Sequence, residues 1–181
     1  MRPQRAGERS ARPLNTTLGG TVRIWLASLA AVLVQPLVLA VRIAPYYFAS
    51  SDPLYGAGAV FLSVVVVAAA VVLMLGVPAF LVLRRFHREG WTSLAIAGFL
   101  LGALLAAVPS WPRYQEGYSA GENWHGRYVD TYINGVPTTY AWLSYAENVF
   151  YFGIHGLVGA IAFYLVWRIL QRRADSVVPA A

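Results

Sequence analysis

Four side chains with strong hydrogen-bonding or charge character interrupt otherwise apolar stretches of the sequence. Gln35 and Arg42 lie in the first stretch, and Glu147 and His155 lie in the last. Ionisable groups are expensive to place in a membrane and are often functional there. A histidine and a carboxylate can relay protons, which is one interpretation of His155 and Glu147. The alternative is that these residues have structural roles only. Arg42 would then extend to the headgroups, Glu147 would favour a helix N-terminus, and His155 would be a hydrogen-bonded interior residue.

The spacing of these four residues predicts two matched pairs. Gln35 precedes Arg42 by seven residues, which is about 10 Å along a helix. His155 follows Glu147 by eight residues, which is about 12 Å. If the two helices are antiparallel neighbours, Arg42 faces Glu147 at one depth and Gln35 faces His155 at another.

A second group of titratable residues lies between residues 111 and 143, at Glu116, Glu122, His125 and Asp130. Their spacing matches no metal-ligand motif, so we predict neither a metal nor a cofactor. Nucleophile, zinc-protease and phosphate-loop motifs are also missing, so no catalytic residue is assigned. The sequence offers no surface of interleaved basic and aromatic residues for nucleic acid.

The same segment is rich in aromatic residues and glycines. Asn134-Gly135 is a strong hairpin signal between residues 127–133 and 136–140, with Pro137 confined to an edge. We therefore predict a small β-hairpin and an outer-loop surface made of Trp124, His125, Tyr128, Tyr132, Asn134 and Gly135. The tyrosines and tryptophans suit either a membrane interface or the surface for a ligand or partner.

The composition is that of a membrane protein. The chain has 181 residues, of which 58% are hydrophobic and 12% charged, and it contains no cysteine. Soluble domains have about 25% charged residues, which they need to cover their surface. The low charge therefore predicts that lipid surrounds much of the chain, and the missing cysteines exclude disulfides.

Four apolar stretches are long enough to cross a bilayer as helices. We predict an all-α integral membrane protein with four antiparallel transmembrane helices and a small extracytoplasmic hairpin between the third and fourth. The expected spans are residues 22–42, 57–83, 92–110 and 144–167, with the outer loop at 111–143. They form one transmembrane domain, residues 22–170, between a disordered basic tail at 1–21 and a second tail at 171–181.

Arginine placement predicts the orientation. All 14 basic residues are arginines, and eleven of them flank the spans on the side that carries both chain ends. The positive-inside rule places this side, and both termini, in the cytoplasm of a multi-pass inner-membrane protein. Tryptophans mark the predicted span ends, as expected at membrane interfaces, at Trp91, Trp111, Trp142 and Trp167.

Small residues recur at helical spacing in the last two spans, where they permit close approach of helix backbones. They are Gly98, Gly102 and Ala106 in the third span and Gly153, Gly156 and Ala160 in the fourth. Such a face serves either a contact within the chain or a homodimer. Pro36 and Pro78 lie inside spans and predict kinks.

The stretch from Gly76 to Arg85, followed by Trp91 and the span with Gly98 and Gly102, loosely resembles small inner-membrane proteins of bacteria. The resemblance implies no activity. Our first hypothesis is a non-enzymatic protein that acts through contacts with membrane lipid, with a membrane-protein partner or with a second copy. The alternatives are an oligomeric transport or permeation component and, third, a membrane enzyme that uses the outer loop.

Overall fold

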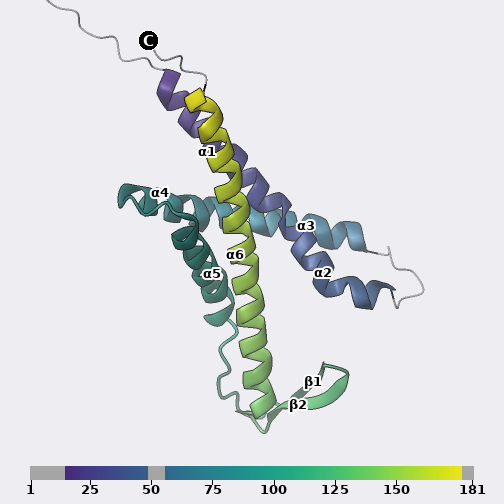
Figure 1. The fold of residues 1–181 in the computed structure, drawn as a ribbon. Coiled ribbons are helices and arrows are strands. Elements are labelled where there is room, and N and C mark those ends of the chain that lie inside the picture. Colours follow the sequence, from purple (N-terminus) through teal and green to yellow (C-terminus); the bar gives the residue numbers. More distant parts are fainter. Residues whose placement is uncertain (1–14, 49–55, 177–181) are drawn as a thin grey trace, which may run out of the picture.

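The computed structural model describes residues 15–48 and 56–176 (Figure 1). It is mostly helical, with one small antiparallel sheet. The elements in chain order are α1 Asn15–Leu33, α2 Gln35–Phe48, α3 Ala57–Val71, the π-helix η1 Val72–Gly76, α4 Val77–Arg85, α5 Trp91–Ala107, β1 Ala120–Trp124, β2 Arg127–Ile133, β3 Val136–Pro137 and α6 Thr139–Ser176.

The helices extend further at both ends of the chain than we predicted. α1 begins at Asn15, so the end of the expected tail 1–21 is helical, and residues 1–14 lie outside the described residues. α6 continues to Ser176, so only residues 177–181 of the expected tail 171–181 lie outside it. Between the predicted spans 22–42 and 57–83, residues 49–55 lie outside the described residues.

Three helices within the described ranges are long and apolar enough to cross a membrane: Gly19–Ala44, Ala57–Arg85 and Thr139–Ala174. They contain the predicted spans 22–42, 57–83 and 144–167. α5 is apolar but shorter, with 17 residues, and ends at Ala107 rather than at residue 110. Pro109 explains the early end, because its nitrogen has no hydrogen to donate to the carbonyl four residues earlier, whereas Val108 is still helical.

α5 and α6 run side by side in opposite directions (Figure 1). Their contact is made of the predicted small residues. A Cβ added to Gly98 would meet the carbonyl of Gly156 and lie 2.6 Å from Cβ of Ala160, and one added to Gly102 would meet the carbonyl of Phe152. The backbones therefore touch where side chains are missing, and the small-residue face is a contact within the chain.

The other members of the small-residue set belong to the same interface. A Cβ on Gly153 would lie 2.6 Å from the ring of Phe99, and Ala106 is buried on α5. Close backbone contact of this kind supplies van der Waals attraction in lipid, where helices have no hydrophobic drive to associate. α5 and α6 therefore form the most extensively packed pair in the described fold.

A helix irregularity accompanies each of the two prolines for which a kink is predicted. The first span is interrupted at Val34, immediately before Gln35 and Pro36, and its two halves are α1 and α2. The second span contains η1 directly before Val77 and Pro78. Proline provides no backbone donor and clashes with the preceding turn, which accounts for both irregularities.

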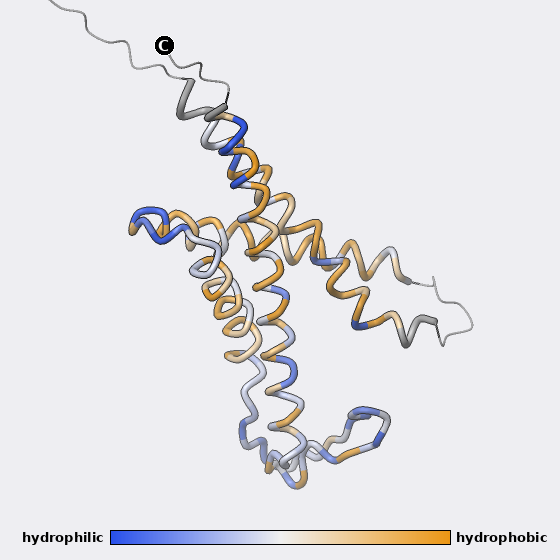
Figure 2. Tube along the Cα trace, in the orientation of Figure 1, coloured by the Kyte–Doolittle hydropathy of each residue, from blue (hydrophilic) through white to orange (hydrophobic). Residues whose placement is uncertain are grey.

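The helices do not all lie alongside one another. α1 packs against α6, whereas α2 diverges from it after the break and approaches α3 (Figure 1). The continuous rod of α3, η1 and α4 runs across α6 in Figure 1. Apolar residues fill the middle of these helices, and polar ones gather at the turn between α4 and α5 and in the sheet (Figure 2).

A buried aromatic cluster joins α4 to α6. The ring of Phe80 lies 4.8 Å from that of Phe163 and 5.3 Å from that of Trp167, between centroids. All three are buried, together with Ala27 of α1. Trp167 was expected at a membrane interface, but only 5% of it is exposed, because Phe80 covers it.

The predicted hairpin is confirmed. β2 and β3 pair antiparallel with Ile133 opposite Val136, and both turn residues have positive φ, 49° for Asn134 and 85° for Gly135. The unpredicted strand β1 pairs with the other edge of β2, through a second two-residue turn at His125 (φ 50°) and Gly126 (φ 82°). The sheet is therefore two consecutive tight hairpins.

Enlarging a glycine of the α5–α6 interface should destabilise the protein. Gly98→Leu places its side chain against the backbone of Gly156, and overpacking of this kind costs about 1–3 kcal/mol. We expect a lower melting temperature in detergent. Gly58→Leu is the matched control, because a Cβ there meets nothing within 4 Å; equal effects of both variants would show that α5 and α6 do not touch at this point.

Candidate functional site

The candidate site lies where one face of α6 meets α1 and α2. Glu147, Tyr151, His155 and Gly159 recur at every fourth residue of α6 and so share one face of the helix. Their counterparts come from the region of the break between α1 and α2. The result is a row of polar and aromatic groups that runs along the contact between the two chain segments.

Gln35 and His155 form the deepest part of this row. His155 Nδ1 lies 2.6 Å from Gln35 Oε1, and Gln35 Nε2 donates to the carbonyl of His155 at 3.2 Å. Because Oε1 can only accept, Nδ1 carries the proton in this arrangement. The predicted contact between Gln35 and His155 is confirmed, and 93% of the surface of Gln35 is covered.

The helix break makes room for this contact. Gln35 is the first residue of α2, and its Nε2 also donates to the carbonyl of Ala31 at 3.1 Å. Side chains near a proline commonly satisfy carbonyls in this way inside a membrane. On α6, a Cβ at Gly159 would lie 2.7 Å from Nε2 of Gln35, so glycine leaves the space that the amide fills.

Above this pair, Tyr151 connects His155 to Arg42. The rings of Tyr151 and His155 meet edge to face, with centroids 4.6 Å apart. The guanidinium carbon of Arg42 lies 4.0 Å from the centre of the Tyr151 ring. This is a cation–π contact, which is stronger where water is scarce.

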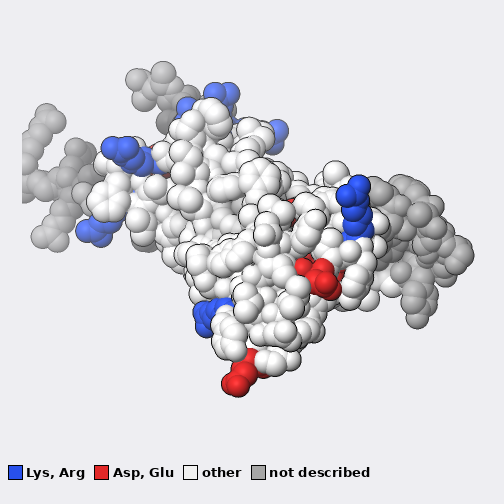
Figure 3. All heavy atoms as spheres, turned by 90° about the horizontal axis from the view of Figure 1, so that it is seen from below, with Lys and Arg blue, Asp and Glu red and all other residues white. Residues whose placement is uncertain are grey.

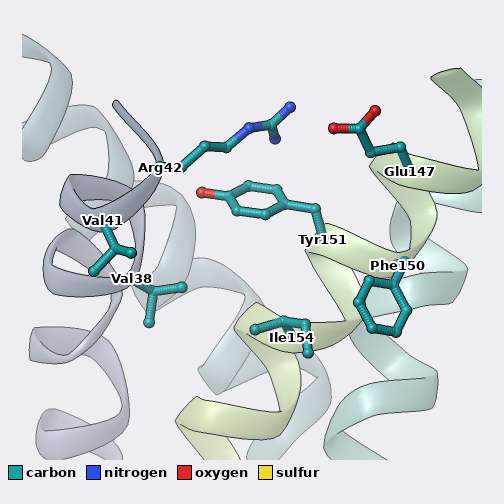
Figure 4. A pocket seen from close by; sticks show the side chains of 7 residues that line it. All are labelled: Val38, Val41, Arg42, Glu147, Phe150, Tyr151 and Ile154. Carbon is teal, nitrogen blue, oxygen red and sulfur yellow. The ribbon is translucent and has the colours of Figure 1, made fainter. Parts of the chain in front are cut away.

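Arg42 and Glu147 face each other, as the sequence predicted, but they are not hydrogen-bonded to one another. No ion pair joins them within the described ranges; Glu147 instead accepts from Nε1 of Trp124 at 3.0 Å and lies 3.1 Å from Nε2 of His125. The hydrogen-bond partners of the Glu147 carboxylate therefore come from the sheet and its turn. Arg42 and Glu147 nevertheless line one hollow, and their charged ends point toward one another above Tyr151 (Figure 4).

This hollow lies between α2 and α6 and has a volume of about 460 Å³. Its walls are apolar, and polar groups are found only at one end, with Arg42, Glu147 and Tyr151 (Figure 4). The apolar lining residues are Val38, Val41, Phe150 and Ile154. The divergence of α2 from α6 leaves the hollow open at the side.

The outer-loop residues divide into two groups. Trp124 and His125 reach α6 through Glu147, and the Trp124 ring also contacts that of Tyr140 at 5.6 Å. Tyr128 is 76% exposed on β2 and its ring lies over Gly121 of β1, whereas the ring of Tyr132 packs against that of Tyr118, with centroids 5.2 Å apart. Asn134 and Gly135 form the turn.

The contact between the sheet and Glu147 was not predicted from the sequence. Trp124 and His125 flank a turn whose His-Gly pair is a weaker hairpin signal than Asn-Gly, so β1 went unrecognised. Within the described ranges, no group of three His, Asp or Glu residues lies close enough to hold a metal ion. The arrangement offers hydrogen bonds, one cation, one carboxylate and apolar walls.

Comparisons with protein-family models, with curated proteins and with solved structures give no match to this chain. The functional argument therefore depends on the geometry of the site.

Removing both members of the deep polar pair should cost less free energy of unfolding than the sum of the two single removals. Gln35→Leu leaves Nδ1 of His155 buried without its acceptor, at a cost of about 1–3 kcal/mol. A double-mutant cycle with His155→Leu, measured by unfolding in detergent, should give a coupling near 0.6 kcal/mol and below about 1.7 kcal/mol.

Ser63→Ala is the control, since this exposed hydroxyl bonds only to Ala59 of its own helix. We expect a change within about 0.5 kcal/mol. Strictly additive effects of the Gln35 and His155 substitutions would contradict the contact between them.

Proposed function

We propose that this chain is an inner-membrane protein with four crossings and both ends in the cytoplasm, and that it acts by binding a lipid in the hollow between α2 and α6. Four crossings require α5 as the third span. Its 17 residues reach about 26 Å, the lower end of the range for membrane helices.

Exposed apolar surface supports the membrane location. Large apolar side chains lie open along the helices, including Val41 (79%), Met74 (74%) and Leu37 (67%). Soluble monomers rarely expose continuous apolar surface of this extent. Seen from the end that carries the sheet, charged groups are few and most of the surface carries none (Figure 3).

The observation that carries the proposal is the make-up of the hollow. A lipid needs an apolar wall for its chain and polar groups for its headgroup, and the hollow provides both at opposite ends. It is open at the side, where a lipid can enter from the bilayer without crossing water. A soluble ligand would have to enter through that same apolar opening.

The transport alternative has less support. The polar row on α6 ends at His155, and the residues that continue its four-residue spacing are Gly159 and then Phe163 and Trp167 of the buried aromatic cluster. One copy of the chain therefore presents a polar path that stops at a dry core. The enzyme alternative has one histidine paired with one carboxylate, and among the described residues no group of three His, Asp or Glu could hold a metal ion.

Reporter fusions test the orientation. A cytoplasmic reporter should be active when fused to either chain end, and a periplasmic reporter should be active when inserted at the turn of Asn134 and Gly135. The chain ends then share a compartment that the sheet does not enter. Activity of one reporter at all three places would contradict four crossings.

Filling the hollow tests lipid binding. Val41→Trp adds bulk to a wall residue that is 79% exposed, so the fold should tolerate it. We expect the purified variant to retain less co-purified phospholipid, as measured by native mass spectrometry. Val67→Trp is the control, on α3 and 62% exposed outside the hollow. Equal retention by both variants and the unchanged protein would contradict binding in the hollow.

A further inference from the structure

We propose that the hollow selects a phospholipid whose headgroup carries both a phosphate and a primary ammonium, with the phosphate at Arg42 and the ammonium at Glu147. This assignment rests on the proposed binding of lipid in the same hollow. It adds a headgroup class that the apolar walls alone would not specify.

Arg42 provides the phosphate contact. Its side chain is exposed, its guanidinium carbon lies 4.0 Å from the centre of the Tyr151 ring, and within the described ranges no carboxylate lies within 4.0 Å of it. A guanidinium presents five N–H donors in a planar fork, and an edge of that fork matches two oxygens of a phosphate. The contact with Tyr151 therefore holds the cation at the hollow before any ligand arrives.

Glu147 provides the ammonium contact. Both of its hydrogen bonds, from Trp124 and His125, involve Oε2, and no described group bonds to Oε1. Its side chain is 42% exposed at the polar end of the hollow. An –NH₃⁺ group has three donors for such an oxygen, whereas a quaternary ammonium has none.

The two charges are complementary to a zwitterion because they do not neutralise each other. They lie on either side of Tyr151 and face a shared gap (Figure 4). A phosphoethanolamine group, whose charges are two carbons apart, carries the opposite charge for each of them. A headgroup with a phosphate but no ammonium would leave Glu147 near a second negative charge, which disfavours it.

The height of the two charges agrees with a headgroup site. Trp111, Trp142 and Tyr145 form a cluster of rings with centroids 5.3–6.0 Å apart, and Trp142 and Tyr145 lie five and two residues before Glu147 on α6. Such residues prefer the membrane interface. The acyl chain then lies toward Ile154, about 10 Å deeper along α6.

The test is lipid competition on the full-length protein. It is equilibrated in vesicles with equal amounts of phosphatidylethanolamine, phosphatidylglycerol and phosphatidylcholine, and retained lipid is counted by native mass spectrometry. We expect phosphatidylethanolamine to exceed the other two by about threefold to fivefold, the scale of a partly exposed ion pair.

Three variants separate the two contacts. Glu147→Gln keeps an acceptor for Trp124 but should abolish the preference over phosphatidylglycerol. Arg42→Gln should lower retention of all three lipids, and Arg42→Lys, which keeps the charge without the planar fork, should fall between it and the unchanged protein. Arg127→Gln, an exposed arginine of β2 outside the hollow, should change nothing.

Lipid retention without headgroup preference, or a preference that survives Glu147→Gln, would overturn the headgroup assignment and leave lipid binding standing. A lower melting temperature of Glu147→Gln would show that the preference was lost through unfolding, and this result would also overturn the headgroup assignment. Displacement of lipid by free O-phosphoethanolamine would assign the charges to a soluble ligand. Retention of no lipid at all would instead overturn the proposed function.

Discussion

The backbone contact between α5 and α6 is the constraint on which the rest of the structure depends. Gly98 and Gly102 of α5 approach Gly156 of α6 so closely that a Cβ on any of them would collide with a carbonyl. A bilayer offers no hydrophobic drive for helices to associate, so contact of this closeness replaces it. With α5 fixed on one face of α6, another face is left for α1, and this second face carries the polar row.

The second face shows how polar groups are accommodated without water. Gln35 and His155 satisfy one another, and the carbonyl of Ala31, released at the helix break, accepts from the same amide. The break also turns α2 away from α6 and so creates the hollow that Arg42 and Glu147 line. One irregularity in the first span thus accounts both for the deepest hydrogen bonds and for the proposed lipid site.

The sequence predicted features that depend on spacing along one element. Depth matching found the contact of Gln35 with His155, and turn chemistry found the hairpin at Asn134 and Gly135. Features that depend on how separate elements meet were missed. Matching residues by their depth in the membrane did not reveal that Glu147 would bond to the sheet rather than to Arg42, or that Phe80 would bury Trp167. The distribution of arginines predicts on which side of the membrane each loop lies, but it does not predict the direction in which α3 crosses α6.

The most direct test of the account is whether lipid fills the hollow. The chain has no cysteine, so a single spin label can be placed at Val38→Cys or Ile154→Cys, with Met74→Cys and Tyr128→Cys as references, in phospholipid nanodiscs. If lipid fills the hollow, labels at residues 38 and 154 should collide readily with oxygen and poorly with a water-soluble nickel complex, as the label at residue 74 does. The label at residue 128 should show the reverse. Nickel access at 38 and 154 equal to that at 128 would mean that water fills the hollow, which would contradict the account.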